Sequence, residues 1–141
     1  MSSRLEHANI VVRDIDAALR FLQTALPDFA VGHEGRGLKG RWLHVGTADS
    51  YLTLSQSSRE PAQPWEPYSG LPGVNHLSFV VDDVEALRQR MSAAGYRDST
   101  VPNAHPWRRR VYFNDPDGND WEFVQYLTDD PALRNDYEIA D

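Results

Sequence analysis

The sequence contains no cysteine, so it can form neither a disulfide framework nor a thiolate metal site. Any metal must therefore bind through oxygen and imidazole ligands. No apolar run approaches the ~18 residues that cross a membrane, and the start, MSSRLEHANIVV, has no secretory apolar segment. Basic residues are also few: 14 Lys and Arg stand against 21 Asp and Glu, a net charge of −7. We therefore expect a cytoplasmic protein with no nucleic-acid and no membrane partner.

The 141 residues contain an internal repeat. The stretch EHANIVVRDIDAAL (6–19) aligns with NHLSFVVDDVEALR (75–88) at an offset of 69 residues, so that His7 matches His76. The same offset places GTADSYLTLS (46–55) on DPDGNDWEFV (115–124), and Thr53 then matches Glu122. A repeat that persists over two separate stretches indicates a duplicated unit within one domain.

Each copy has the pattern β-α-β-β-β, which predicts an α+β fold of two modules. In the first module, 5–57, we expect strands at 5–12, 29–34, 40–46 and 51–57, and a helix from Asp14 or Asp16 to about Leu26. In the second module, 74–127, we expect strands at 74–81, 96–101, 109–114 and 120–126, and a helix at 83–94 that Gly95 ends. Residues 58–73 carry four prolines and form the expected linker, and 128–141 form a polar tail.

Alternation along the strands divides their side chains between two faces. The more uniformly apolar face of each sheet should pack on its helix, and the mixed face should be concave. His7, His76, Thr53 and Glu122 all fall on the mixed face. Glu122, between Trp121 and Phe123, then points either to water or into a cavity. A pseudo-twofold relation between the modules would bring the four residues around one point.

Two imidazoles and one carboxylate are the donors of a facial triad for an octahedral divalent metal. We therefore predict His7, His76 and Glu122 as metal ligands. Each residue alone is more simply explained as an ordinary strand residue, and only the symmetry-related set favours a metal. Two further features stay open: WRRR (107–110) is either a solvated strand edge or a site for substrate carboxylate or phosphate. Trp65 and Tyr68 either close over a ligand or hold the linker in place.

The stretches LEHANIVV, NHLSFVVDDVEAL and VYFNDPDGNDWEF resemble the vicinal oxygen chelate superfamily over residues 5–126. That superfamily includes glyoxalase I, extradiol dioxygenases, fosfomycin-resistance thiol transferases, methylmalonyl-CoA epimerase and metal-free bleomycin-binding proteins. The resemblance implies two βαβββ modules that form an open, barrel-like mixed sheet with helices outside. It also implies a metal held by the first and last strands of each module, and a homodimer. Thr53 stands where other members have a carboxylate or glutamine ligand, so the implied site has three protein ligands.

The stretch NAHPWRRRVYFNDPDGNDWE (103–122) also resembles the C-terminal signature of extradiol dioxygenases. This resemblance implies that His105 hydrogen-bonds substrate or dioxygen and that Tyr112 contacts the metal-bound substrate oxygen. The further acid–base histidine of those enzymes has no counterpart in 51–75, and His44 is the nearest candidate.

We therefore expect a metal-dependent oxidoreductase, an extradiol-type dioxygenase acting on a small vicinal diol or catechol, with Fe(II) favoured over Mn(II), Ni(II) or Zn(II). The alternatives are a glyoxalase-like lyase, a fosfomycin-type thiol transferase, and a metal-free drug-binding protein.

Overall fold

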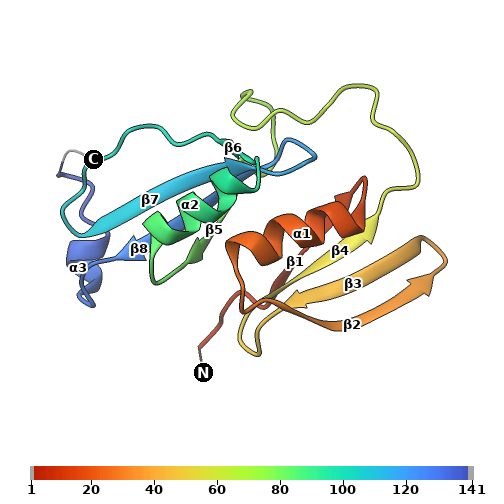
Figure 1. The fold of residues 1–141 in the computed structure, drawn as a ribbon, viewed down its shortest axis with the longest axis horizontal. Coiled ribbons are helices and arrows are strands. Elements are labelled where there is room, and N and C mark those ends of the chain that lie inside the picture. The colour runs from red at the N-terminus through yellow and green to blue at the C-terminus, as the bar shows by residue number, and fades with distance from the viewer. Residues whose placement is uncertain (1, 140–141) are drawn as a thin grey trace. The chain divides into compact units, whose positions relative to one another are not determined.

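The computed structural model describes residues 2–139, which divide into two compact units, one ending at Pro64 and the other beginning at Trp65. Figure 1 traces them in chain order. The first unit contains β1 (His7–Val12), α1 (Ile15–Ala25), β2 (Ala30–Gly37), β3 (Gly40–Gly46) and β4 (Tyr51–Gln56). The second contains β5 (His76–Val80), α2 (Val84–Ala93), β6 (Arg97–Asp98), β7 (Arg108–Asn114), β8 (Asp120–Tyr126) and α3 (Pro131–Arg134).

Each unit is built on a four-stranded mixed sheet, with the orders β1-β4-β3-β2 and β5-β8-β7-β6. The first strand of each unit pairs in parallel with the last, and the other pairs are antiparallel. The registers match as well: His7 lies opposite Tyr51 in one sheet, and His76 lies opposite Asp120 in the other. The predicted α+β fold of two βαβββ modules is confirmed, and the offset of 69 residues holds in three dimensions.

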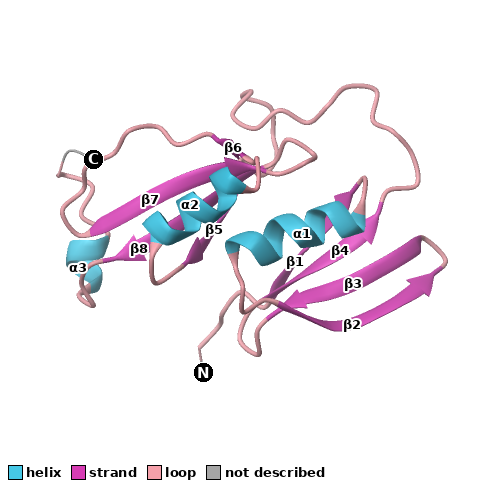
Figure 2. Ribbon diagram, in the orientation of Figure 1, coloured by secondary structure: helices cyan, strands magenta, loops and turns pink. Residues whose placement is uncertain are grey.

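The two long helices begin where the sequence places a capping aspartate. The Asp14 carboxylate accepts hydrogen bonds from the main-chain N–H groups of Asp16 and Ala17, and that of Asp83 accepts from Ala86. These bonds satisfy N–H groups that have no partner within a first helical turn. In each unit the helix lies along one face of the sheet (Figure 2).

The core of each unit lies between its helix and its sheet. In β4, Leu52 and Leu54 are buried on the side that faces α1, together with Phe21 and Leu22 of that helix. In β8, Trp121 and Phe123 are buried, as the alternating pattern predicts. The side chains at the positions between them are left for the opposite face of the sheet.

A buried carboxylate organises the turn that leads into β8. Asp115, only 8% exposed, accepts hydrogen bonds from the main-chain N–H groups of Asp117 and Asn119 and from the indole Nε1–H of Trp121. Gly118 has a φ of +84°, a conformation that glycine adopts without a steric penalty. The turn therefore fixes both the start and the facing of the strand that carries Glu122.

Three regions differ from the sequence prediction. The strand expected at 96–101 is only Arg97–Asp98, because the Asp98 carboxylate accepts the main-chain N–H of Thr100 and turns the chain. Residues 65–73, expected in a linker, belong to the second compact unit. The polar tail forms α3, whose first turn Asp130 caps.

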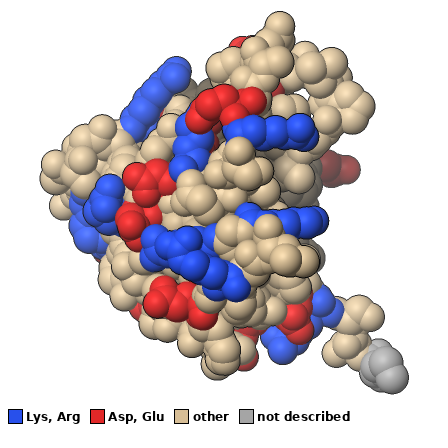
Figure 3. Space-filling model, turned by 90° about the vertical axis from the view of Figure 1, so that its right-hand side faces the viewer, with Lys and Arg blue, Asp and Glu red and all other residues tan. Residues whose placement is uncertain are grey.

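The surface carries both signs of charge. On the face drawn in Figure 3, Lys and Arg side chains lie among Asp and Glu side chains. Among residues 2–139, no helix combines the length and the apolar character needed to cross a bilayer.

Candidate functional site

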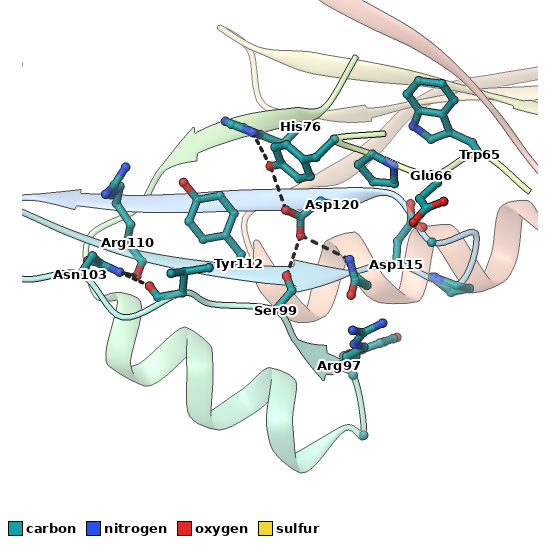
Figure 4. A pocket seen from close by; sticks show the side chains of 18 of the residues that line it. Trp65, Glu66, His76, Arg97, Ser99, Asn103, Arg110, Tyr112, Asp115 and Asp120 are labelled. Carbon is teal, nitrogen blue, oxygen red and sulfur yellow. Dashed lines mark hydrogen bonds between the residues drawn. The ribbon is translucent and has the colours of Figure 1, made fainter. Parts of the chain in front are cut away.

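The second unit contains a pocket of about 1040 Å³. Its wall is formed by the segment around Tyr68, by the start of β5, by the loop after β6, by β7 and by the turn before β8. Polar side chains that line it include His76, Ser99, Arg110, Tyr112 and Asp120 (Figure 4). A pocket with convergent polar groups is the natural place to look for a ligand site.

Two of the three predicted metal ligands meet in this unit. His76 Nε2 lies 3.2 Å from Glu122 Oε2, and Glu122 is only 9% exposed. Cis ligands of an octahedral ion bound at roughly 2.1 Å would lie about 3 Å apart, so this spacing fits two ligands of one ion. The parallel register explains the meeting, because Ser78 lies opposite Glu122 and His76 is two residues earlier on the same face.

Tyr112 and Arg110 of β7 complete the surroundings of Glu122. The Tyr112 hydroxyl donates a hydrogen bond to Glu122 Oε1 at 3.0 Å, and Arg110 Nη1 lies 3.9 Å from the same oxygen. Burial, and then the charge and hydrogen bond of Glu122, raise the pKa of Tyr112 to about 12. The hydroxyl therefore remains a donor at neutral pH.

Tyr68 and Asp120, which were not predicted as site residues, lie on the Nδ1 side of His76. The Tyr68 hydroxyl lies 2.8 Å from His76 Nδ1 and donates to Asp120 Oδ2 at 3.0 Å. Asp120, 7% exposed, also accepts from Ser99 Oγ at 2.6 Å and from Asn114 Nδ2 at 3.3 Å. Burial, and then the hydrogen bond to Asp120, raise the pKa of Tyr68. Asp120 could have been found from its strand phase, which it shares with Glu122. Tyr68 was expected either to close over a ligand or to hold the linker in place, and no pattern indicated its contacts with His76 and Asp120.

The third predicted ligand, His7, lies in the first unit, where Glu6 and Tyr51 hold it. Its Nδ1 lies 3.0 Å from Glu6 Oε1, and the same oxygen accepts from the Tyr51 hydroxyl at 2.7 Å. The His7 and Tyr51 rings stack with centroids 4.9 Å apart. The bond from Tyr51, and then that from His7, lower the pKa of Glu6.

His44 and Thr53, the other candidates in the first unit, lie on neighbouring strands. His44 lies opposite Thr53 in the β3–β4 register, as Tyr112 lies opposite Glu122 in the second unit. Its ring is 4.8 Å from that of Tyr51, so His44 shares the face that carries His7. Thr53 is buried at 7% exposure.

The ring nitrogens of His105 contact other groups than the residues around Glu122. It is 4% exposed, its Nδ1 accepts the main-chain N–H of Trp107 at 3.1 Å, and its Nε2 donates to the Asp136 carbonyl at 2.8 Å. It is also not among the residues that line the pocket. With both ring nitrogens bonded to main-chain groups, His105 connects the tail to the loop before β7, and this placement favours a structural role.

The three arginines of WRRR are separated by strand alternation. Arg110 lines the pocket, whereas Arg108 is buried, with its guanidinium 4.6 Å from the ring centroid of Tyr137. Arg109 is exposed. Of the three, Arg110 alone is a candidate for contact with a ligand in this pocket.

Across residues 2–139, no three His, Asp or Glu side chains form a group that could hold a metal ion. Two predicted ligands meet in the second unit, and the third belongs to the first unit. The donor set of His76 and Glu122 fits a divalent ion, and the pocket beside it has room for a small molecule.

The comparison with known families identifies the superfamily of this chain. The family model of the Glyoxalase/Bleomycin resistance protein/Dioxygenase superfamily matches residues 4–123. The chain belongs to this superfamily. The resemblance of the sequence to the vicinal oxygen chelate superfamily is therefore confirmed.

Three similar proteins illustrate the range of the superfamily. The uncharacterized protein YwbC of Bacillus subtilis (strain 168) is 29% identical over 136 residues, which cover 89% of this chain and 99% of YwbC. The genomically encoded fosfomycin resistance protein FosX of Listeria monocytogenes is 20% identical with a TM-score of 0.72, over 95% of this chain and 97% of FosX. Another structure of that FosX contains Mn(II) and a sulfate ion. The antibiotic binding protein TnmS3 from a Streptomyces species is 28% identical with a TM-score of 0.64, over 89% and 97% of the two chains.

Proposed function

We propose that this chain is a divalent-metal-dependent enzyme that acts on a small anionic molecule with neighbouring oxygen atoms. The observation that carries the proposal is the 3.2 Å approach of His76 Nε2 to Glu122 Oε2 beside a pocket. His7 would be the third protein ligand. A homodimer is part of this proposal, on the ground of family resemblance.

The donor set suits several ions. Imidazole and carboxylate bind Mn(II), Fe(II), Ni(II) and Zn(II), and the similar FosX has been seen with Mn(II). Mn(II) is therefore the first ion to test, ahead of the Fe(II) expected from the dioxygenase resemblance. Such an ion supplies Lewis-acid polarisation of substrate oxygens.

The residues of the chain have separate parts in this function. Glu122 adds the negative charge that a divalent ion requires, and Tyr112 orients it through the bond to Oε1. Arg110 brings a guanidinium to the pocket wall, which favours substrates with a carboxylate, phosphate or phosphonate group.

Ring cleavage by an extradiol dioxygenase has weaker support. That chemistry needs His105 next to the substrate, and here both nitrogens of His105 bond main-chain groups. We therefore place addition or isomerisation reactions on an anionic substrate ahead of oxidation. Binding of an antibiotic without chemistry is the second candidate, because the 28% identical TnmS3 is an antibiotic binding protein.

The metal site is tested by Glu122→Gln, which keeps the shape of the side chain and removes its charge. Since loss of an outer-shell partner alone costs about 10–100-fold in metal affinity, loss of this ligand should weaken Mn(II) binding by more than about 100-fold. The measurement is calorimetric titration of chelator-treated protein. Glu85→Gln, an exposed change on α2, is the matched control and should bind as wild type does. Stoichiometric Mn(II) binding of unchanged affinity by Glu122→Gln would remove the proposed site.

The reaction class needs a separate measurement. We expect metal-loaded protein to consume an epoxide or enediol substrate with a phosphonate or carboxylate group, and to use no oxygen with catechols. Oxygen uptake with a catechol would restore the dioxygenase. Metal-independent binding of a drug without turnover would favour the binding protein.

A further inference from the structure

The two histidines proposed as ligands share a feature that the ligand assignment does not require. A tyrosine and a carboxylate lie next to Nδ1 of each histidine. The carboxylate of Glu6 contacts Nδ1 of His7 directly, whereas the Tyr68 hydroxyl contacts Nδ1 of His76. We propose that Glu6 with Tyr51, and Asp120 with Tyr68, are positioning pairs that keep His7 and His76 in the tautomer with Nδ1 protonated and Nε2 open. This inference rests on the proposed function for the ion that Nε2 would bind, and on hydrogen bonds alone for the tautomer.

In the first unit the tautomer follows from the acceptor. Glu6 Oε1 lies 3.0 Å from His7 Nδ1 and already accepts the Tyr51 hydroxyl at 2.7 Å. An ionised carboxylate only accepts, so His7 Nδ1 must carry the hydrogen. A neutral imidazole then has its lone pair on Nε2, which is the atom left for an ion. The stacked Tyr51 ring limits rotation of the imidazole.

In the second unit the tautomer follows from counting hydrogens. The Tyr68 hydroxyl has one hydrogen, which it donates to Asp120 Oδ2. Its contact of 2.8 Å with His76 Nδ1 is therefore a hydrogen bond only if His76 donates. His76 Nε2 is then unprotonated in the neutral ring, and it faces Glu122 Oε2 at 3.2 Å. Two acceptors at this distance repel each other unless a cation lies between them, as a shared metal ion would.

The two units reach the same tautomer by different routes. The residue opposite the histidine on the neighbouring strand is Tyr51 in the first unit and Asp120 in the second. The second residue of each pair lies outside the strands: Glu6 precedes β1, and Tyr68 lies in the segment before β5. The group that contacts Nδ1 is a carboxylate in one unit and a hydroxyl in the other. In both units the proton lies on Nδ1, which leaves the lone pair of the imidazole on Nε2.

The backbone at Tyr68 adds an independent observation. Its φ is 63°, in the left-handed region, and it is the one non-glycine residue among residues 2–139 with positive φ. Such a conformation is unfavourable for a residue with a side chain and persists only where the surrounding structure stabilises it. The main-chain N–H of Tyr68 donates to Asn75 Oδ1 at 2.9 Å, which stabilises the turn that brings the hydroxyl to His76.

The tautomers can be measured in the metal-free protein at pH 8, where histidine is ordinarily neutral. Two-bond ¹⁵N–¹H correlation spectra should show Nδ1–H for His7 and His76. His105, with Nε2 bonded to a carbonyl, should show the opposite tautomer and is an internal reference. Tyr68→Phe should shift His76 toward the ordinary Nε2–H mixture and leave His7 unchanged, and Glu6→Ala should do the reverse. Tyr137→Phe is the matched control and should move neither.

Metal affinity is the second readout. Tyr68→Phe and Glu6→Ala should each weaken Mn(II) binding about 10–100-fold, as loss of an outer-shell partner does. A wild-type His76 with Nε2–H, or variants that keep both the tautomer and the affinity of wild type, would overturn the positioning role and leave the proposed function standing. Wild-type protein that binds no divalent ion would overturn both.

Discussion

At the scale of single residues, the three histidines predicted for the site have different contacts in the structure. In His7 and His76, Nδ1 contacts a side chain, and Nε2 of His76 lies next to Glu122 Oε2. In His105 both ring nitrogens are occupied, by Trp107 and Asp136. Residue type and spacing did not distinguish these cases, because the distinction depends on which hydrogen-bond partner reaches which ring nitrogen.

The structural role of His105 leads to a prediction. His105→Ala removes partners from a main-chain N–H and a carbonyl, and each polar group left unsatisfied when buried costs about 1–3 kcal/mol. We expect a lower free energy of unfolding in urea and faster amide exchange in the tail after α3, with wild-type Mn(II) affinity. His33→Ala, at an exposed position on β2, is the control and should be close to neutral. A catalytic His105 would instead give slower turnover at unchanged stability.

At the scale of elements, the second unit is held at its edge by an ion pair between α2 and β6. Arg88 Nε donates to Asp98 Oδ2 at 2.7 Å, and the Thr100 main-chain N–H donates to Oδ1. Burial opposes ionisation of Asp98, but the hydrogen bonds from Thr100 and Arg88 outweigh it and lower the pKa of this carboxyl. The same bonds end β6 after two residues, which is why the longer strand predicted there does not form.

This pair predicts a dependence of stability on pH. A carboxyl whose pKa is lowered on folding stabilises the protein above its unfolded pKa of about 3.9, and the contribution disappears as pH falls through the folded value. Asp98→Asn should therefore lower the free energy of unfolding at pH 7, by less than about 1 kcal/mol because the pair is partly exposed. At pH 2 to 3 the difference from wild type should be smaller. Thermal unfolding at both pH values measures it, with Asp82→Asn as the charge-matched control; an equal difference at both pH values would contradict the assignment.

At the scale of the whole molecule, the proposed ligands come from both compact units. His7 belongs to the first, and His76 and Glu122 belong to the second. An ion bound by all three would stabilise only the folded protein, by about 2.7 kcal/mol at a concentration 100 times its dissociation constant. We therefore expect saturating Mn(II) to raise the Tm of the wild type.

A variant of His7, the proposed ligand from the first unit, tests whether this residue binds the ion. His7→Ala should remove most of the Mn(II)-induced rise in Tm, although no residue of the second unit has been changed. His33→Ala should keep the full rise. A rise of wild-type size in His7→Ala would exclude His7 from the site. Mixing His7→Ala with Glu122→Gln protein then tests the homodimer, since recovery of Mn(II) binding requires that two copies share a site.

The sequence by itself determined the duplicated fold and the facing of its strands. Alternation along a strand has a period of two, so His76 and Glu122 had to share a face, and a parallel register brought them together. The helix starts at Asp14 and Asp83 were equally local, since a cap depends on residues two or three positions away. Neighbouring residues determine local geometry, and the helix starts and strand faces could therefore be predicted from the sequence.

Only the tertiary structure decided which groups complete the site. Tyr68 reaches His76 and Asp120 through a left-handed turn in a proline-rich segment, and the tail reaches His105 from beyond β8. These contacts join residues far apart in the chain through loops that have no periodicity. Their hydrogen bonds depend on the final packing, which is why the sequence showed that His76 and Glu122 share a face but not that Tyr68 would contact His76.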